Sequence, residues 1–327
     1  MKNRYFALAA LAAVTVSTLA SAPAMAAQWP TQPVQIVVPY PPGGNVDVAA
    51  RLIAPGLEKR FGQPFVVENR AGAGGMIAGE YVARAKPDGY TLWMAANGPL
   101  LFSPIIFKRP TAYHWQTSFE PISTVSLTPM VMQAHPSVKA NTFQEFIDYA
   151  RKHPEGLNMA SPGAGTSNHL VSELLMKETG ARWVTVHYKG NAPATTDLIG
   201  GQVHFNFDQI SVALPFIKDG KVKPLAVTAD KRIPSLPDVP TLKESGLQDF
   251  VAYTFTGLLA PKGTPSDVVD RISAALKEIL AEPAIAEKFQ SMGAEARSAS
   301  PAEFSRYIEA EDKRWTPIIK AVGIDAN

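Results

Sequence analysis

The sequence predicts an α/β fold in which mostly parallel sheets, each flanked by helices, form two domains. Short β-branched apolar runs alternate with stretches of helical spacing, and this alternation is typical of parallel strands covered by helices. Two longer apolar segments, 122–134 and 251–259, are interpreted as strands that cross between the domains and return. The chain has 327 residues, of which 46% are hydrophobic, so it can bury a core in each domain without disulfides.

The first 26 residues have the pattern of an export signal. Lys2 and Arg4 precede an apolar stretch, Phe6–Leu19, that is too short to cross a bilayer, and Ala24-Met25-Ala26 is an A-x-A cleavage site. We therefore expect the mature chain to start near Ala27. No later stretch has the ~18 consecutive apolar residues of a membrane span, and the sequence holds no cysteine for a lipid anchor or a disulfide.

The mature chain is expected to carry no net charge. The whole sequence has 31 basic and 29 acidic residues, and loss of Lys2 and Arg4 with the signal leaves 29 of each. A balanced chain has no field of one sign that would favour nucleic acid or a membrane surface. We therefore expect no nucleic-acid partner, and any bound anion must be held by local groups.

The first predicted βα unit contains a glycine loop. Val34–Val38 is a β-branched run that predicts a buried strand, and Pro39 ends it because proline cannot donate to a sheet. Gly43-Gly44 forms the loop, helical spacing begins at Val46, and Pro55 is expected to kink the helix. A glycine loop at a helix N-terminus can hold an anion on its N–H groups, although an ordinary βα turn has the same pattern.

The next segments continue the alternation. Strands are expected at 65–68 and 91–95, the second ending at Asn97-Gly98-Pro99, with a helix at 76–85 between them. The loop before this helix has Gly72 and Gly74 but Ile77 where a dinucleotide fingerprint requires glycine. Dinucleotide binding is therefore not expected.

The second half repeats the pattern of the first. Thr142 and Glu145 form a capping box for a helix through Arg151, and a strand is expected at 157–160. The stretch Ser161–His169 then forms a second glycine loop that opens a helix with a hydroxyl N-cap. Further strands are expected at 183–187, 203–208, 225–228 and 251–259, and further helix starts at Asn191, Thr264-Pro265 and the capping box Ser300–Glu303.

Catalytic and metal chemistry find little support in the sequence. Ser167 lies in Gly165–His169, but His169 occupies the position where a nucleophile elbow needs its second glycine. Two residues apart at a helix start, Ser167 and His169 would not point at each other. The six histidines are scattered without metal-ligand spacing, and His169 and His187 are better candidates for hydrogen bonding. We expect no catalytic residue, metal or cofactor.

The two glycine loops, one in each half, remain as the candidate site. Facing each other across a cleft, their N–H groups, hydroxyls and helix dipoles would favour a carboxylate over a cation or a neutral sugar. Five aromatic residues either line an apolar wall of this site or pack in the core: Tyr40, Phe205, Phe207, Tyr253 and Phe255.

Several motifs resemble those of the Bug-type receptors, the solute-binding proteins of tripartite tricarboxylate transporters. They occur in the family's order and span nearly the whole mature chain. They are Trp29-Pro30, Pro39–Asp47, Val67–Gly75, Lys86–Leu92, Gly165–Leu170, Tyr188–Gly190 and Leu259–Pro265.

The resemblance implies a periplasmic two-domain binding protein of the Venus flytrap type, with a carboxylate held between two βα loops in the interdomain cleft. It also implies that the ligand is delivered to a two-component membrane permease. The chain departs from the family pattern at Asn45, Pro55 and His187. The ligand-binding residues expected by position are Tyr40, Gly43, Gly44, Asn45, Asp47, Asn97, Gly163, Thr166, Ser167, His169, Tyr188 and Asp208.

The crossing strands predict the domain boundaries. Residues 27–127 and 254–327 are expected to form one domain and residues 128–253 the other, in a monomer. The ligand class stays open among di- and tricarboxylates, acidic amino acids and aromatic acids. Two other functions are weighed against transport: a ligand sensor that presents its closed form to a signalling membrane protein, and a secreted hydrolase acting through Ser167.

Overall fold

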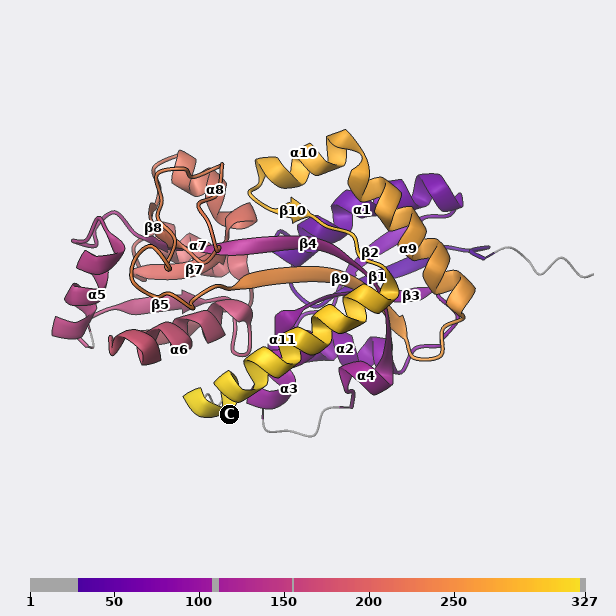
Figure 1. Cartoon of the computed structure of the whole chain (residues 1–327), viewed down its shortest axis with the longest axis horizontal. Coiled ribbons are helices and arrows are strands. Elements are labelled where there is room, and N and C mark those ends of the chain that lie inside the picture. Colours follow the sequence, from indigo (N-terminus) through magenta and orange to yellow (C-terminus); the bar gives the residue numbers. More distant parts are fainter. Residues whose placement is uncertain (1–28, 108–111, 155, 324–327) are drawn as a thin grey trace, which may run out of the picture.

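A computed structural model describes residues 29–107, 112–154 and 156–323, so the predicted export signal lies outside the described residues (Figure 1). The described strands form one curled sheet of ten strands in the order β2-β1-β3-β9-β4-β7-β5-β6, with β8 and β10 both paired to β4. The strands are β1 Val34–Val38, β2 Phe65–Asn69, β3 Thr91–Ala96, β4 Phe119–Ala134, β5 Asn158–Ser161, β6 Val184–His187, β7 Phe205–Gln209, β8 Lys223–Val227, β9 Tyr253–Pro261 and β10 Glu295–Ala296.

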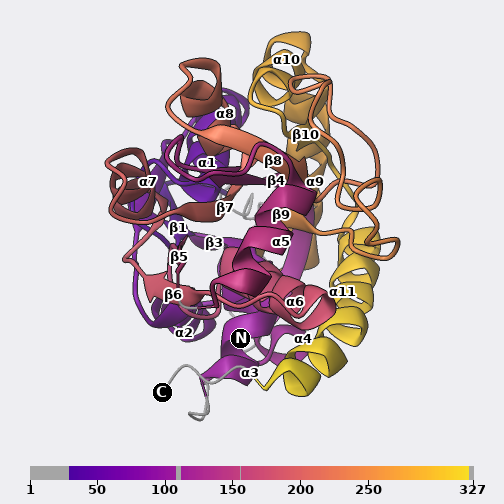
Figure 2. The ribbon, with the colours of Figure 1, turned by 90° about the vertical axis from the view of Figure 1, so that its left-hand side faces the viewer.

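Helices cover both faces of this sheet. Figure 2 shows α7 on one side and α11 on the other, with the strands between them. The α-helices are α1 Asn45–Phe61, α2 Met76–Ala83, α3 Ser103–Ile106, α4 Trp115–Ser118, α5 Phe143–Lys152, α6 Ser167–Thr179, α7 Asn191–Ile199, α8 Ile210–Lys218, α9 Ser266–Ala281, α10 Pro283–Ser291 and α11 Pro301–Val322. Two short helices of other types are η1 Ala73–Gly75 and η2 Gly98–Phe102.

The outer strands of each half of the sheet are parallel, as the alternating pattern predicts. β1 pairs in parallel with β2 and β3, and β5 pairs in parallel with β6 and β7. The two long central strands differ, because β9 runs antiparallel to both β3 and β4. The sheet is therefore mixed, with its antiparallel pairs gathered where the halves join.

β4 joins the two halves of the sheet. Residues 119–129 of this strand pair with β9, whereas residues 130–134 pair with β7 and β8. The change of partner falls at Thr128-Pro129, where the sequence predicts the first crossing. β9 runs beside β4 in the opposite direction, so two extended segments span the junction (Figure 1).

Most helix starts follow the predicted capping, and two do not. Thr166 caps α6 by accepting a hydrogen bond from the N–H of His169, and the capping box at Ser300 is formed. Asn191, expected as an N-cap, is the first residue of α7 after Gly190, and its side chain turns to Asp208 instead.

The start of α9 also differs from the prediction, which has Thr264 as the N-cap and Pro265 as the first helical residue. The Thr264 hydroxyl donates to the Pro261 carbonyl at 2.8 Å, so it closes a turn and does not cap the helix. α9 therefore begins at Ser266, after Pro265. In α1, Pro55 lies inside a helix that continues without interruption to Phe61.

The largest apolar cluster extends through both halves of the sheet. It joins Trp93 of β3 with Phe205 of β7, and it includes Trp315 of α11. α11 packs on β4 and on α6, so this helix contacts both halves (Figure 1). Three of the five aromatic residues considered for a pocket wall lie in this core, fully buried: Phe205, Phe207 and Phe255.

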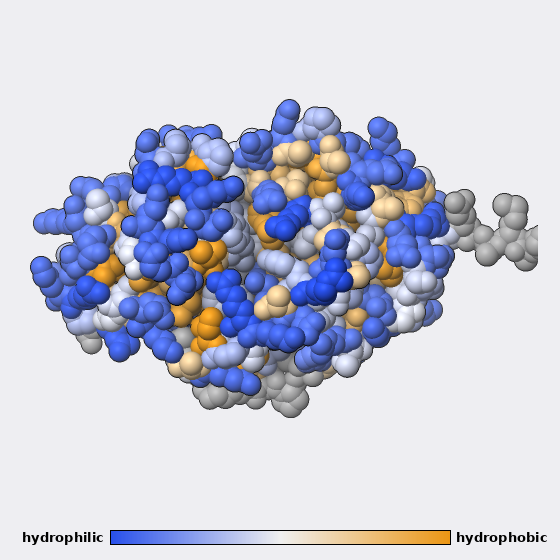
Figure 3. All heavy atoms as spheres, in the orientation of Figure 1, coloured by the Kyte–Doolittle hydropathy of each residue, from blue (hydrophilic) through white to orange (hydrophobic). Residues whose placement is uncertain are grey.

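The surface is largely hydrophilic. Figure 3 shows one face of the molecule, on which apolar residues occur as scattered groups among polar and charged residues. Within the described ranges, no helix combines the length and the apolar character needed to cross a membrane.

Candidate functional site

A small cavity lies where the N-terminal ends of four helices meet. The first residues of α1, α6 and α7 reach it, together with Gln209, which directly precedes α8. Its volume of about 20 Å³ admits a water molecule but no organic molecule, so the two sides are closed together. The lining residues, none of them charged, are Tyr40, Asn45, Val46, Ala96, Pro162, Thr166, Ser167, Asn168, Asn191, Gln209 and Thr254.

The N-termini of the four helices contribute partial positive charge at the cavity. The first N–H groups of a helix have no partner within it, and the aligned peptide dipoles place partial positive charge there. α1, α7 and α8 have no side-chain cap, whereas Thr166 satisfies one N–H group of α6. Because several uncapped N-termini converge on uncharged walls, the cavity favours an anion without using a cationic side chain.

Asn45 brings an unpaired donor to this cavity. Its side-chain oxygen accepts hydrogen bonds from the Ser211 hydroxyl at 2.8 Å and the Thr128 hydroxyl at 3.2 Å. Its Nδ2 is buried and has no partner among the described residues. A buried amide N–H group that lacks a partner is costly, so it is expected to meet an acceptor in the occupied site.

The opposite wall is a network of amide side chains centred on Gln209. The Gln209 Nε2 donates to Asn168 Oδ1 at 3.0 Å and to the Thr254 hydroxyl at 3.1 Å. Its Oε1 accepts from Asn191 Nδ2 at 3.2 Å. Because one side chain holds three others, the polar wall has a fixed arrangement before any ligand enters.

Asp208 lies directly behind this wall. Its carboxylate accepts hydrogen bonds from Asn191 Nδ2, from the Gln209 N–H at 2.9 Å and from the Thr195 hydroxyl at 3.2 Å. Burial nevertheless raises the pKa of Asp208 to about 7, because no cation compensates its charge. Asp208 therefore orients Asn191 and does not itself line the cavity.

In the first loop, Asp47 shapes the backbone. Its carboxylate accepts from the Gly43 N–H at 2.9 Å, from Asn69 Nδ2 at 2.9 Å and from Arg51 Nε at 3.0 Å. Burial opposes ionisation of Asp47, but these hydrogen bonds outweigh it and hold the pKa of the carboxyl below its usual value. Gly43 has φ of +85°, which a residue with a side chain rarely adopts.

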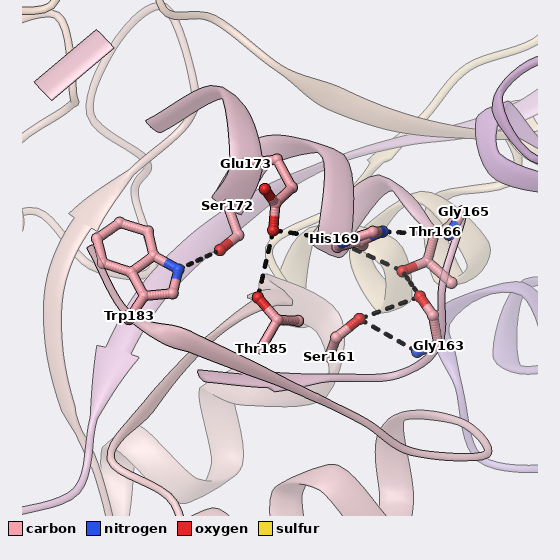
Figure 4. Close-up of polar contacts among 9 residues, drawn as sticks. All are labelled: Ser161, Gly163, Gly165, Thr166, His169, Ser172, Glu173, Trp183 and Thr185. Carbon is pink, nitrogen blue, oxygen red and sulfur yellow. Dashed lines mark hydrogen bonds and ion pairs between the residues drawn. The ribbon is translucent and has the colours of Figure 1, made fainter. Parts of the chain in front are cut away.

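The second loop is tied by short-range hydrogen bonds (Figure 4). The Gly163 carbonyl accepts from the hydroxyls of Thr166 at 2.8 Å and Ser161 at 3.0 Å. The His169 ring lies behind the loop, where its Nδ1 accepts from the Gly165 N–H at 3.3 Å. These contacts fix the loop and leave the Ser167 side chain at the cavity.

Among the described residues, the histidine nearest to Ser167 in sequence does not act as a base on its hydroxyl. The two nitrogens of the neighbouring His169 ring face Gly165 and Glu173, the second at 3.5 Å. The hydrolase alternative therefore lacks the hydrogen-bonded serine–histidine pair that it needs. Within the described part of the chain, no group of three or more His, Cys, Asp or Glu residues could hold a metal.

The structure brings four of the predicted residues to the cavity surface: Tyr40, Asn45, Thr166 and Ser167. Six more of the predicted residues lie next to that surface, in the two loops or behind the walls. They are Gly43, Gly44, Asp47, Gly163, His169 and Asp208. Two others are engaged elsewhere. Asn97 Nδ2 donates to the Glu311 carboxylate, and Asn97 Oδ1 accepts from the Phe255 N–H. The Tyr188 hydroxyl donates to Asp197 at 2.7 Å.

Sequence reasoning missed four polar lining residues: Asn168, Asn191, Gln209 and Thr254. Asn168 adjoins Ser167, and Gln209 adjoins Asp208, so both lie within one residue of a predicted position. The pattern around Asn191 predicts an N-cap. Thr254 lies inside a strand, and nothing in its neighbourhood marks it as a site residue.

Glycines form the edges of the closed cavity, where the two sides touch. A Cβ atom on Gly44 would lie 3.2 Å from Asn191 Oδ1, and one on Gly190 would lie 3.0 Å from Pro41. Ser103 of α3 donates to the carbonyls of Gly74 and Gly165, at 2.9 Å and 3.1 Å. The loop glycines therefore permit close backbone approach across the cavity.

Comparison with known proteins gives a consistent result. A family model described as Tripartite tricarboxylate transporter family receptor matches residues 49–324. Protein BugT of Bordetella pertussis is 33% identical over 303 residues, which cover 93% of each chain. The structure of R. palustris Rpa4515 with adipate is 35% identical and covers 91% of this chain and 99% of its own, with a TM-score of 0.88. MatC (Rpa3494) from Rhodopseudomonas palustris with bound malate is 33% identical and covers 89% and 99%, with a TM-score of 0.84.

The buried Asp208 predicts a pH dependence of stability. Because its pKa rises from 3.8 to about 7 on folding, the folded chain binds more protons between these values, and the free energy of unfolding falls as pH rises through them. Asp208→Asn keeps the accepting oxygen and removes the charge. We expect the difference in stability, variant minus wild type, to grow from pH 4.5 to 7.5 by on the order of 1–4 kcal/mol.

Urea unfolding at several pH values measures this difference. The exposed Asp219→Asn substitution is the control, and its difference from wild type should stay constant. Parallel stability curves for Asp208→Asn and wild type would show that the burial of this carboxyl is fully compensated.

Proposed function

The chain belongs to the tripartite tricarboxylate transporter receptor family, whose members are periplasmic solute-binding receptors and not enzymes, and on this premise we propose that it captures an organic carboxylate in the cavity and delivers it to a membrane permease. The proposed ligand position is the space between Asn45 of α1 and Ser167 of α6. Delivery would appear as loss of carboxylate uptake in cells that lack this chain, restored by supplying it.

The observation that carries the proposal is the unpaired Asn45 Nδ2 beside uncapped helix N-termini. These groups are donors, and together they require an acceptor with negative charge. The lining residues contribute no cation. Arg51, the nearest cation in the first loop region, already pairs with Asp47 at 3.0 Å.

The relatives support the same chemistry. Rpa4515 is described with adipate and MatC with malate, and each of these ligands has two carboxylates. In the present cavity both carboxylates would be met by N–H groups, hydroxyls and water. Selectivity then depends on the shape of the wall, which Tyr40, Asn191 and Gln209 help to form.

The cavity must widen to admit an acid, because about 20 Å³ is too small for one. We place the moving boundary at the two crossing segments, with residues 27–127 and 254–327 in one domain and 128–253 in the other. The change of partner along β4 supports this division. Opening there would separate Asn45 from Ser211 and Ser103 from Gly165, two of the hydrogen-bonded pairs that now join the two sides.

Ligand charge is the first test. We expect an organic acid from a carboxylate panel to bind at neutral pH and its methyl ester or amide not to bind, because an uncharged group leaves the aligned donors without their anion. A ligand at ~100 times its Kd adds about 2.7 kcal/mol to the free energy of unfolding, so thermal shift detects it. Equal affinity for ester and acid, measured by calorimetry, would refute the helix-terminus account of the site.

Closure is the second test. Gly44→Val should hold the sides apart, because its side chain would run into Asn191, so both affinity and ligand-induced compaction should fall. Ser167→Ala should lose one charge-assisted hydrogen bond, roughly 1.5–3 kcal/mol or about 10- to 150-fold in Kd, while compaction persists. Calorimetry and small-angle scattering separate the two. Unchanged affinity in both variants would move the site elsewhere.

Export is the third test. The pattern of residues 1–26 supports a cleaved signal and a periplasmic mature chain. N-terminal sequencing of the protein from a periplasmic extract should begin near Ala27. Full-length protein that keeps Met1 in the cytosol would contradict export.

A further inference from the structure

The loop that precedes α2 has a strained backbone. All four of its residues 72–75 have positive φ, and three of them are glycines. The fourth is Ala73, whose φ of +48° makes it the one residue other than glycine with positive φ in the described part of the chain. A side chain in this region is unfavourable, so the backbone keeps this form only where contacts from outside the loop hold it.

Ser103 of α3 joins this loop to the second glycine loop. Ser103 is fully buried, and its hydroxyl lies 2.9 Å from the Gly74 carbonyl and 3.1 Å from the Gly165 carbonyl. A serine hydroxyl has one hydrogen to donate, so the two carbonyls share it. In the proposed division Ser103 and Gly74 belong to one domain and Gly165 to the other. Only the bond to Gly165 therefore crosses between the domains.

Gly74 also touches the second glycine loop directly. A Cβ atom on Gly74 would lie 2.9 Å from the Ala164 carbonyl oxygen, and it would overlap the Ser103 hydroxyl. A backbone oxygen cannot rotate away as the end of a side chain can. The two loops can therefore meet this closely only with glycine at position 74.

This contact lies directly beside the cavity. Gly165 precedes Thr166, which lines the cavity and caps α6. The carbonyl of Gly165 and the N–H of Thr166 belong to one peptide group, so the Ser103 hydroxyl holds the peptide that leads into Thr166. The Thr166 hydroxyl donates in turn to the Gly163 carbonyl at 2.8 Å (Figure 4). The contact with Ser103 thus determines where this part of the cavity wall lies.

We propose that Gly74 and Ser103 are positioning residues that seat the second glycine loop when the domains close, and that this seat slows the escape of a bound carboxylate. The inference rests on the proposed carboxylate site, and it adds a third loop, residues 72–75, to the two glycine loops that were expected to form it. Neither residue is among those that line the cavity, so both act through the second glycine loop.

The seat acts in the closed form alone. On opening, the Ser103 hydroxyl keeps the Gly74 carbonyl as its acceptor, and the Gly165 carbonyl turns to water. No donor is then left without a partner, so opening loses only the bond that crosses between the domains and the packing of Gly74. A contact that is absent from the open form changes the rate at which a ligand leaves, koff, and leaves the rate of entry, kon, as it was.

Stopped-flow kinetics with malate and adipate, using whichever binds more tightly, test the seat. Ser103→Ala removes the shared hydrogen bond, so we expect koff to rise about 2- to 10-fold with kon unchanged. Gly74→Ala should raise koff further, because its methyl group overlaps the Ala164 carbonyl. If Gly74→Ala does not fold, the result for Ser103→Ala, which loses only a hydroxyl, decides the test.

Two matched variants separate the seat from a general loss of stability. Gly62 has φ of +70° and open space where a Cβ atom would lie, so Gly62→Ala strains the backbone without a collision. Ser123 is fully buried like Ser103, but its hydroxyl bonds to Thr124 and Ala299 within one domain. Both controls should lower stability and leave koff unchanged. A wild-type koff in Ser103→Ala, or an equal rise in Ser123→Ala, would overturn the inference.

A measurement without ligand separates this inference from the proposed function. The sequence has no cysteine, so cysteines introduced at the exposed Lys59 of α1 and Lys152 of α5 can carry a unique pair of spin labels. The distance between the labels in the free protein, measured by electron–electron resonance, should lengthen in Gly74→Ala and stay at the wild-type value in Gly62→Ala. If no carboxylate of the panel binds but the distance lengthens this way, the proposed function fails and the seat stands. Equal distances in all three proteins overturn the seat, whatever binds.

Discussion

The antiparallel pairing of β4 with β9 determines where the site can form. Between them these strands join the two halves of the sheet, and they place Thr128 and Thr254 beside the cavity. Strands on either side are parallel, so their carboxyl ends deliver the glycine loops and helix starts to one place. Gly257 in β9 lets the Phe304 ring of α11 pack directly on this strand, because a Cβ atom there would overlap the ring. The packing of α11 on β9 thus also holds this strand in place.

The chemistry of the cavity follows from that geometry. Donors come from the starts of helices and from amide side chains, and Asp208, whose pKa burial raises to about 7, lies one layer back. A cationic side chain in the lining would bind any anion strongly. Directed N–H groups instead require an acceptor in the right place, which links affinity to the position of the carboxylate as well as to its charge.

Much of this architecture could be predicted from the chain itself. Val34–Val38 and the two glycine loops were recognisable because a β-branched run, a glycine loop and helical spacing follow each other directly. The change of strand partner at Thr128-Pro129 falls where a proline interrupts a long apolar run. These are local patterns, and the structure retains them.

The remaining features depend on contacts that local patterns do not contain. Asn191 looked like a cap, but Asp208 on a different element draws its side chain away. Asn97 looked available at a strand end, but Glu311, distant in sequence, occupies its amide. Phe205 and Phe255 were expected in the core more than in a pocket wall, and the burial that places them there is a property of the assembled sheet.

Substitutions in the cavity wall and substitutions at the closing glycine contacts would have different effects. Gly44 meets the Asn191 side chain and Gly190 meets the Pro41 ring, so each closing contact joins a glycine backbone to one side chain of the other side. Substitutions of wall residues other than Asn191 can therefore alter which acid fits while these contacts stay the same. Substitutions at the edges act on how long a ligand is retained. Changes of the first kind would alter which ligand fits and leave the closing contacts in place.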